Sequence, residues 1–202
     1  YWGSFFFNNQ ARARLEESGA EVLFFRGHRF FGRNHKKILI IDNKTAFIGG
    51  VNLAERHRYW LDLHLRLAGG VVGYLLRSFI KSYVLSGGQT KINPPVSKLT
   101  ALKIRFIDHW PLKKRRAFKK HYKKACWSAE RSITITTPYF VPHPWLVKIL
   151  HRAVSRGLRV DILLPEKTDW ALLNWANYIF ASLVYRPGIN FYFVKKFIHA
   201  KA

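Results

Sequence analysis

The sequence predicts an α/β sandwich of two pseudo-symmetric halves, each with a mixed sheet flanked by helices. Short apolar runs rich in β-branched residues alternate with longer runs of helical period, which is typical of strands joined through helices. A helix, a glycine, a strand, a basic loop and a His-x-Lys triplet follow one another twice, and such a repeat predicts two related units. We expect a first half at residues 1–90 and a second half at residues 91–202.

Each element is predicted from its local pattern. The first helix ends at Gly19, a common helix stop. Residues 37–42 are apolar almost throughout, as in a strand buried on both faces, and Asn43-Lys44 is a plausible tight turn. The expected helices are 5–18, 71–84, 112–131, 144–156 and 171–184, and the expected strands are 20–25, 37–42, 45–48, 60–67, 133–136, 159–164 and 189–194.

Residues 60–67 alternate strictly between leucines and polar or aromatic residues. In a strand, alternate residues share a face, so the four leucines lie on one side and Trp60, Asp62, His64 and Arg66 on the other. The polar side is either a solvent-exposed face or the lining of a site.

The composition says more about which classes of partner the protein can bind than about its fold. The chain has 35 Lys and Arg against 11 acidic residues, a net charge of +24. Anionic membranes, nucleic acids and phosphorylated substrates all suit such a charge. The single cysteine, Cys126, excludes an internal disulfide framework and disfavours a zinc site, so we expect no metal and no cofactor.

The two ends of the chain predict a fragment of a longer protein. The sequence contains no methionine, and it stops at Ala202 within an apolar and basic pattern. No uninterrupted apolar run reaches the roughly 18 residues that would cross a bilayer. Any transmembrane helices are therefore expected outside this segment.

The first copy of the repeat carries a recognisable motif. His35-x-Lys37 is followed by Asp42, and then by a Gly-Gly-x-Asn turn made of Gly49, Gly50 and Asn52. This pattern resembles the HKD signature of the phospholipase D superfamily, and His199-x-Lys201 resembles the first part of a second copy. The segments 60–69, 138–142 and 153–157 resemble those of bacterial cardiolipin synthases. The resemblance covers nearly the whole chain and implies a phospholipase D-like sandwich.

The resemblance also implies a chemistry. Exchange of one alcohol for another on a phosphodiester can proceed through a phosphohistidine, with a second histidine as general acid and base. His35 and His199 would form this pair, with either one as the nucleophile. Cationic and amide groups stabilise the charge that builds on the phosphate oxygens. The residues implied for that contact are Lys37, Lys201 and Asn52.

Two acidic residues have different expected roles. Asp42 lies on the opposite strand parity from His35 and Lys37, so we interpret it as structural, together with Gly49 and Gly50. Asp62 is the better candidate for orienting a catalytic histidine, because the resembling family carries an acid at about that place. A solvent-facing strand residue is its alternative.

The basic helix at 112–131 is either an ordinary solvated helix or a surface for anionic lipid. Aromatic residues interleave with its charges, and more follow nearby. Aromatic rings commonly lie at membrane interfaces. The residues expected at a substrate or membrane surface are Lys113, Arg115, Arg116, Tyr139 and Phe140.

The resemblance thus implies a phosphatidyltransferase that makes cardiolipin from phosphatidylglycerol, peripheral to or facing the cytoplasm at a bacterial cell membrane. Its partners would be anionic phospholipid and the membrane surface. A phospholipase D-type hydrolase, a superfamily nuclease and an inactive membrane-binding fragment remain alternatives. Nucleic acid is the less favoured partner, because the aromatic segments suit lipid better, and the pattern does not define an oligomeric state.

Overall fold

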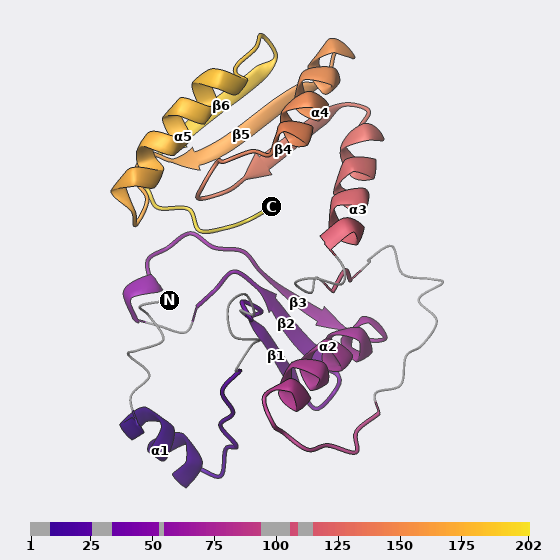
Figure 1. Ribbon diagram of the computed structural model, residues 1–202, viewed down its shortest axis with the longest axis vertical. Coiled ribbons are helices and arrows are strands. Elements are labelled where there is room, and N and C mark those ends of the chain that lie inside the picture. The colour runs from indigo at the N-terminus through magenta and orange to yellow at the C-terminus, as the bar shows by residue number, and fades with distance from the viewer. Residues whose placement is uncertain (1–8, 26–33, 53–54, 94–105, 109–114) are drawn as a thin grey trace.

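The computed structural model describes residues 9–25, 34–52, 55–93, 106–108 and 115–202. Its order of elements is mixed α/β, and it contains two three-stranded sheets. The first sheet lies in the lower part of Figure 1 with one helix against it, and the second lies in the upper part behind two helices. The predicted α/β class is therefore confirmed.

The first sheet is antiparallel throughout. It consists of β1 (Ile38–Ile41), β2 (Thr45–Gly49) and β3 (His64–Ala68) in the order β1-β2-β3. A short turn joins β1 to β2, and only antiparallel neighbours can be joined so tightly. The helices described near it are α1 (Asn9–Glu17), the short 3-10 turn η2 (Glu55–His57) and α2 (Val71–Leu85).

The second sheet is parallel throughout. It consists of β4 (Ser132–Thr136), β5 (Arg159–Pro165) and β6 (Ile189–Val194) in the order β4-β5-β6. The crossover helices α4 (Pro144–Ser155) and α5 (Ala171–Val184) connect these strands, and α3 (Arg115–Trp127) precedes them. A mixed sheet was expected in each half. Among the described strands, however, the first sheet is purely antiparallel and the second purely parallel, because the type of connection determines the direction of the next strand.

The two sheets have cores of unequal size. Thirteen buried residues form the core under α4 and α5, with Leu150, Val160, Ile162, Leu164 and Ile189 at its centre. Among the described residues, the cluster between α2 and the first sheet has four buried members, Ala46, Val71, Val72 and Leu75. More of the described apolar residues are therefore buried at the second sheet, and stability from burial scales with the apolar area removed from water.

Several local expectations differ from the structure, and β3 and α3 are shorter than the strand and helix expected at 60–67 and 112–131. Residues 20–25 form no strand among the described residues. In β1, Leu39 and Ile41 are exposed while Ile38 and Ile40 pack against the α2 core, so the strand is buried on one face only. An apolar run alone cannot show which face finds a covering layer.

The turn after β1 is also shifted by one residue. Asp42 and Asn43 both have positive φ, at 51° and 54°, and the Lys44 N–H donates to Ile41 O at 3.0 Å. Asp and Asn tolerate the left-handed region better than most residues. Asp42 therefore occupies the turn at the far end of β1 from Lys37.

Candidate active site

The second His-x-Lys pair lies on a segment that runs between the two sheets. After β6 the chain returns toward the first half, where Leu61 N–H donates to Phe197 O at 3.0 Å and His199 N–H donates to Leu61 O at 2.7 Å. Ala202 then exchanges two backbone hydrogen bonds with Thr136 of the second sheet. The labelled C-terminal end in Figure 1 accordingly lies between the halves. Backbone pairing on both sides holds His199 at this midline.

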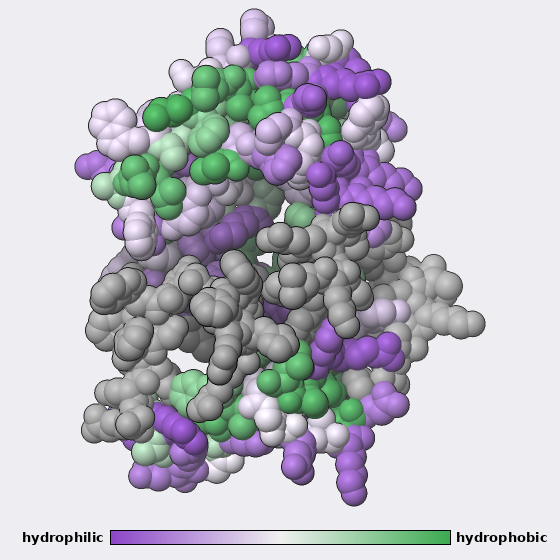
Figure 2. Space-filling model, viewed as in Figure 1, coloured by the Kyte–Doolittle hydropathy of each residue, from purple (hydrophilic) through white to green (hydrophobic). Residues whose placement is uncertain are grey.

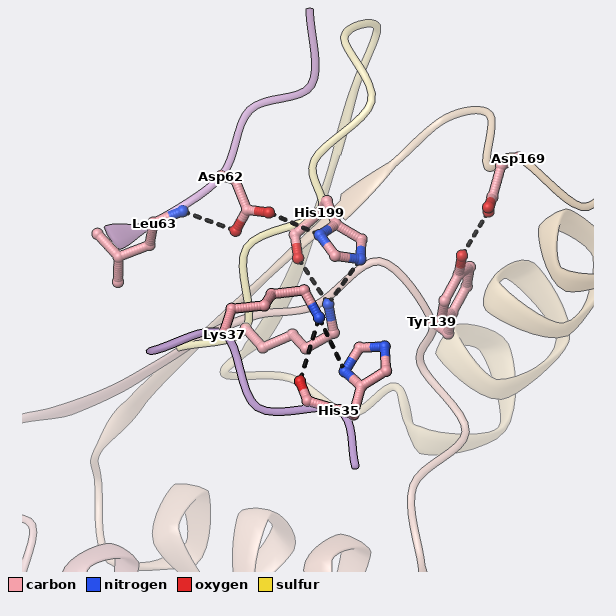
Figure 3. Close-up of polar contacts among 8 residues, drawn as sticks. His35, Lys37, Asp62, Leu63, Tyr139, Asp169 and His199 are labelled. Atoms are coloured by element: carbon pink, nitrogen blue, oxygen red, sulfur yellow. Dashed lines mark hydrogen bonds and ion pairs between the residues drawn. The ribbon is translucent and has the colours of Figure 1, made fainter. Parts of the chain in front are cut away.

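His199 is held by a carboxylate from the first half. Its side chain is 9% exposed, and its Nδ1 lies 2.6 Å from Oδ2 of Asp62. The other carboxylate oxygen, Oδ1, accepts the Leu63 N–H at 2.8 Å. On the opposite side of the ring, Nζ of Lys201 lies 3.0 Å from Nε2. Asp62 therefore fixes the orientation of the His199 ring, as Figure 3 shows.

The Gly-Gly turn makes room for this carboxylate. A Cβ added at Gly50 would lie 2.1 Å from Oδ1 of Asp62, and one added at Gly49 would lie 2.2 Å from Leu63 O. Both distances are far below van der Waals contact. The Gly50 N–H also donates to Leu63 O at 3.0 Å. The two glycines are thus required by the close approach of the strand that carries Asp62.

His35 and Lys37 approach the same place from the start of β1. Nζ of Lys37 lies 3.2 Å from Nδ1 of His35 and donates to His35 O at 3.1 Å. Burial, and then the positive charges of Lys37 and Lys201 and the nearby His199, lower the pKa of His35. Two of these influences come from the second half, so the two pairs share one electrostatic environment (Figure 3).

The lysines are perturbed in the same direction. Burial lowers the pKa of Lys37, and Asp62 opposes this shift. Burial also lowers the pKa of Lys201, with Asp62 and Asp169 opposing and Lys37 adding to it. A low-dielectric setting disfavours charge on an ammonium group. Two half-buried cations at one point form a site suited to an anion.

A cavity of about 550 Å³ joins these groups. Both histidines and both lysines line it, together with Gly49 and Gly50. The rest of its lining is apolar and consists of Ile48, Leu63, Leu65, Leu67, Val71 and Phe106. The cavity therefore combines a cationic end with an apolar wall.

The apolar wall contains functional candidates that the sequence analysis missed. The alternation over 60–67 directed attention to the polar residues, and Asp62 does lie at the site. The leucine face, however, is the face that lines the cavity, through Leu63, Leu65 and Leu67. Its signal was the regular spacing of the leucines, to which the sequence analysis assigned no function.

Other predicted residues lie away from the cavity. Asn52 is partly buried and is not among its lining residues. The Tyr139 hydroxyl donates to the Asp169 carboxylate (Figure 3). Phe140 is 2% exposed and packs against Phe191, so its expected place on a surface is wrong.

The basic surface is only partly described. Lys113 lies outside the described residues, and Arg115 and Arg116 begin α3.

Within the described part of the chain, no group of three or more His, Cys, Asp or Glu residues is arranged to hold a metal ion.

Sequence comparisons connect this arrangement with known proteins. Residues 122–202 match a family model described as "Cardiolipin synthase, PLD-like domain". The chain is 31% identical over 208 residues to the probable cardiolipin synthase YwiE of Bacillus subtilis (strain 168), and 30% identical over 208 residues to the major cardiolipin synthase ClsA of the same organism. These alignments cover 93% of this chain but only 41% and 43% of the relatives. The chain thus spans less than half the length of these curated relatives.

Structural comparison shows the same fold. The crystal structure of phosphatidylserine synthase from Haemophilus influenzae Rd KW20 matches with a TM-score of 0.63 at 13% identity, covering 95% of this chain and 57% of that one. Polyphosphate kinase from Porphyromonas gingivalis matches with a TM-score of 0.54 at 13% identity, covering 95% of this chain and 30% of that one.

Proposed function

We propose that this chain is part of a phosphatidyltransferase of the phospholipase D superfamily, because residues 122–202 match a cardiolipin synthase, PLD-like domain model and the chain is similar to bacterial cardiolipin synthases. It moves a phosphatidyl group from one phosphatidylglycerol to a hydroxyl of a second, making cardiolipin and releasing glycerol. The observation that carries this proposal is that both His-x-Lys pairs and an apolar wall line one cavity. The cationic end suits a phosphodiester, and the apolar wall suits the lipid attached to it.

The reaction has two displacements. A ring nitrogen of His35 attacks phosphorus, the bond from phosphorus to the glycerol oxygen breaks, and His199 supplies a proton to that oxygen. In the second displacement His199 takes the proton from the incoming hydroxyl, whose oxygen attacks phosphorus as the bond to His35 breaks. The phosphatidyl group is conserved and no redox change occurs.

The surroundings of the two rings support this division of roles. The lowered pKa of His35, caused by burial and then by nearby positive charge, keeps its ring uncharged near neutral pH, as a nucleophile requires. His199 contacts the Asp62 carboxylate at 2.6 Å, which compensates the charge of an imidazolium. Asp62 is therefore a positioning residue for the acid and base.

The remaining roles are proposed on position. Lys37 and Lys201 hold the non-bridging oxygens, because both lysines line the cavity and cationic groups stabilise the charge that builds on those oxygens. Asn52 follows the Gly-Gly turn but does not line the cavity, so its proposed role as an amide donor requires a movement toward the phosphate when substrate binds. Asp42, in the turn beyond β1, has a structural role. We also propose a division into halves at residue 90, which is supported by one described sheet on each side of it.

The proposed setting is the surface of a bacterial cell membrane, where the lipid substrate resides. The net charge of +24 favours an anionic surface, at about 1 kcal/mol for each basic residue that comes close to it. No helix in the described ranges is long and apolar enough to span a bilayer.

The test is product analysis with the intact protein on phosphatidylglycerol vesicles. We expect cardiolipin and glycerol in equal amounts, and neither product from a His35→Ala variant. Phosphatidic acid alone would indicate a hydrolase, and His35-dependent cleavage of labelled DNA would indicate a nuclease. Absence of phosphatidyl transfer to any alcohol would refute the proposal.

A further inference from the structure

Helix α5 has an apolar outer face. None of its 14 residues is charged, although the chain as a whole carries a net charge of +24. Leu172, Trp175, Ile179 and Leu183 follow one another at intervals of three or four residues, and so they share one face. Their exposed fractions lie between 52% and 76%.

This face is unusual for a helix that packs on a sheet. Such a helix normally buries one apolar stripe and presents polar residues on the other side. The inner side of α5 is already used, since Asn177, Ala181 and Val184 are buried. Figure 2 shows the hydrophobic side chains gathered over α5 in the upper part of the molecule. A contiguous exposed apolar patch marks an interaction surface.

The ends of the stripe indicate a lipid bilayer as its partner. Trp170 lies at one end and Tyr185 at the other, and both are well exposed. Trp and Tyr are enriched at the level of lipid headgroups, because their rings are apolar with one polar group. Leucine and isoleucine occupy the middle of the stripe, where acyl chains would meet them.

Exposed basic residues lie at the same two ends. Arg186 follows the helix, and Lys167 precedes it. The Glu166 N–H donates to Val194 O at 2.9 Å, so the exposed Lys195 lies near Lys167. Basic residues beside an apolar stripe favour an anionic bilayer.

The size of the stripe argues against a second copy as the partner. A helix of this length extends about 20 Å, and one face of it is smaller than the roughly 800 Å² that each partner buries in a standard protein interface. Insertion into a bilayer needs no such area, because each apolar side chain gains by leaving water independently.

The stripe also begins beside the candidate site. Asp169 directly precedes Trp170 and accepts a hydrogen bond from the Tyr139 hydroxyl (Figure 3). Its negative charge also raises the pKa of Lys201, against the larger effect of burial. A bilayer lying along α5 would therefore reach the edge of the site. We propose that the outer face of α5 docks on anionic lipid bilayers and inserts Trp175 and Leu183 among the acyl chains. The relation to substrate delivery rests on the proposed function, whereas the docking does not.

The test compares two double variants in the intact protein, in a His35→Ala background so that turnover plays no part. Trp175→Ser/Leu183→Ser removes the stripe. Phe79→Ser/Leu85→Ser removes two exposed apolar side chains from α2 and is the matched control. Binding to vesicles of phosphatidylcholine with phosphatidylglycerol is measured by co-sedimentation. We expect the first variant to bind at least about 10-fold more weakly and the control to bind normally.

A second measurement does not depend on affinity. The native Cys126 is buried, so a nitroxide can be attached selectively at Leu183→Cys. This label is expected to become accessible to oxygen and inaccessible to aqueous nickel when vesicles are added. Unchanged binding of the stripe variant would overturn the proposal. So would a label shielded from both reagents before vesicles are added, since protein would then cover the face, from the same chain or a second copy.

Discussion

His35 and His199 occupy the same place in two copies of one pattern, yet their surroundings differ. Each histidine has its own lysine two residues later, with Nζ near a ring nitrogen and donating to the histidine's carbonyl oxygen. At His199 the lysine approaches Nε2, because Asp62 occupies Nδ1. At His35 the lysine approaches Nδ1. The same local sequence therefore places the lysine against a different ring nitrogen in each copy.

The two copies also rest on different platforms. His199 follows a parallel sheet with a core of thirteen buried residues, and its own side chain is nearly buried. His35 precedes an antiparallel sheet whose buried cluster has four members among the described residues. This difference shows that a duplicated motif can keep the same His and Lys residues, while side chains from the other half of the molecule determine the role of each histidine.

Replacing either histidine tests the division of roles most strongly. With phosphatidylglycerol, His35→Ala and His199→Ala should each reduce kcat by about 10⁴-fold or more. A phosphatidyl ester of p-nitrophenol separates them, because its leaving group needs no proton. The His199 variant should then release a burst of p-nitrophenol, and the His35 variant should release none, as measured by stopped-flow absorbance.

His143→Asn is the matched control for these variants. His143 caps α4 by accepting the Trp145 N–H, and asparagine is a good residue at that position. Its activity should be unchanged. A burst of p-nitrophenol from the His35 variant and none from the His199 variant would mean that His199 is the nucleophile and His35 the general acid and base.

Asp62→Asn should have a smaller effect, a reduction of about 10²- to 10⁴-fold in kcat. Asparagine can no longer compensate an imidazolium at His199, and it can also orient the wrong ring tautomer. Asp108→Asn is the matched control, because Asp108 pairs with Lys36 at 2.7 Å on another part of the first half. Steady-state kinetics of the two variants provide the measurement. Equal losses of kcat would mean that Asp62 acts only through folding.

The smallest expected effect is a shift in pH dependence. His35 must be uncharged to attack, so kcat/KM should fall as the pH drops through its lowered pKa. Burial is the first cause of that lowering and the Lys37 charge is the second. Lys37→Met should therefore raise the pKa of His35 toward its ordinary value and move the acidic limb of the profile to higher pH.

Lys36→Met provides the comparison for this shift. The neighbouring lysine points away, toward Ser78 and Asp108, so its removal should leave the limb in place. Histidine-selective NMR titration of the same variants measures the pKa of His35 directly. A limb that moves to lower pH in Lys37→Met would contradict the assignment of His35 as the nucleophile.

Much of the fold could be predicted because its signals are local. The helices expected at 71–84, 144–156 and 171–184 lie within one residue of α2, α4 and α5. The strands expected at 133–136, 159–164 and 189–194 likewise lie within one residue of β4, β5 and β6. Hydrophobic periodicity and helix-ending residues are properties of neighbouring positions in the sequence, and so they can be recognised without the tertiary structure. The run at 20–25 had the same kind of signal but forms no strand among the described residues, since a strand also needs a partner.

By itself, the sequence determined the α/β class, the repeat and the two His-x-Lys triplets, since each is a pattern within a short stretch of chain. Only the tertiary structure decided that Asp62 contacts His199, that the leucines of 63–67 line the cavity, and that Phe140 is buried. It also decided that α5 presents an apolar face outward. The physical reason is that burial and hydrogen bonding join residues distant in sequence, and alternation along a strand or helix cannot show what lies opposite each face.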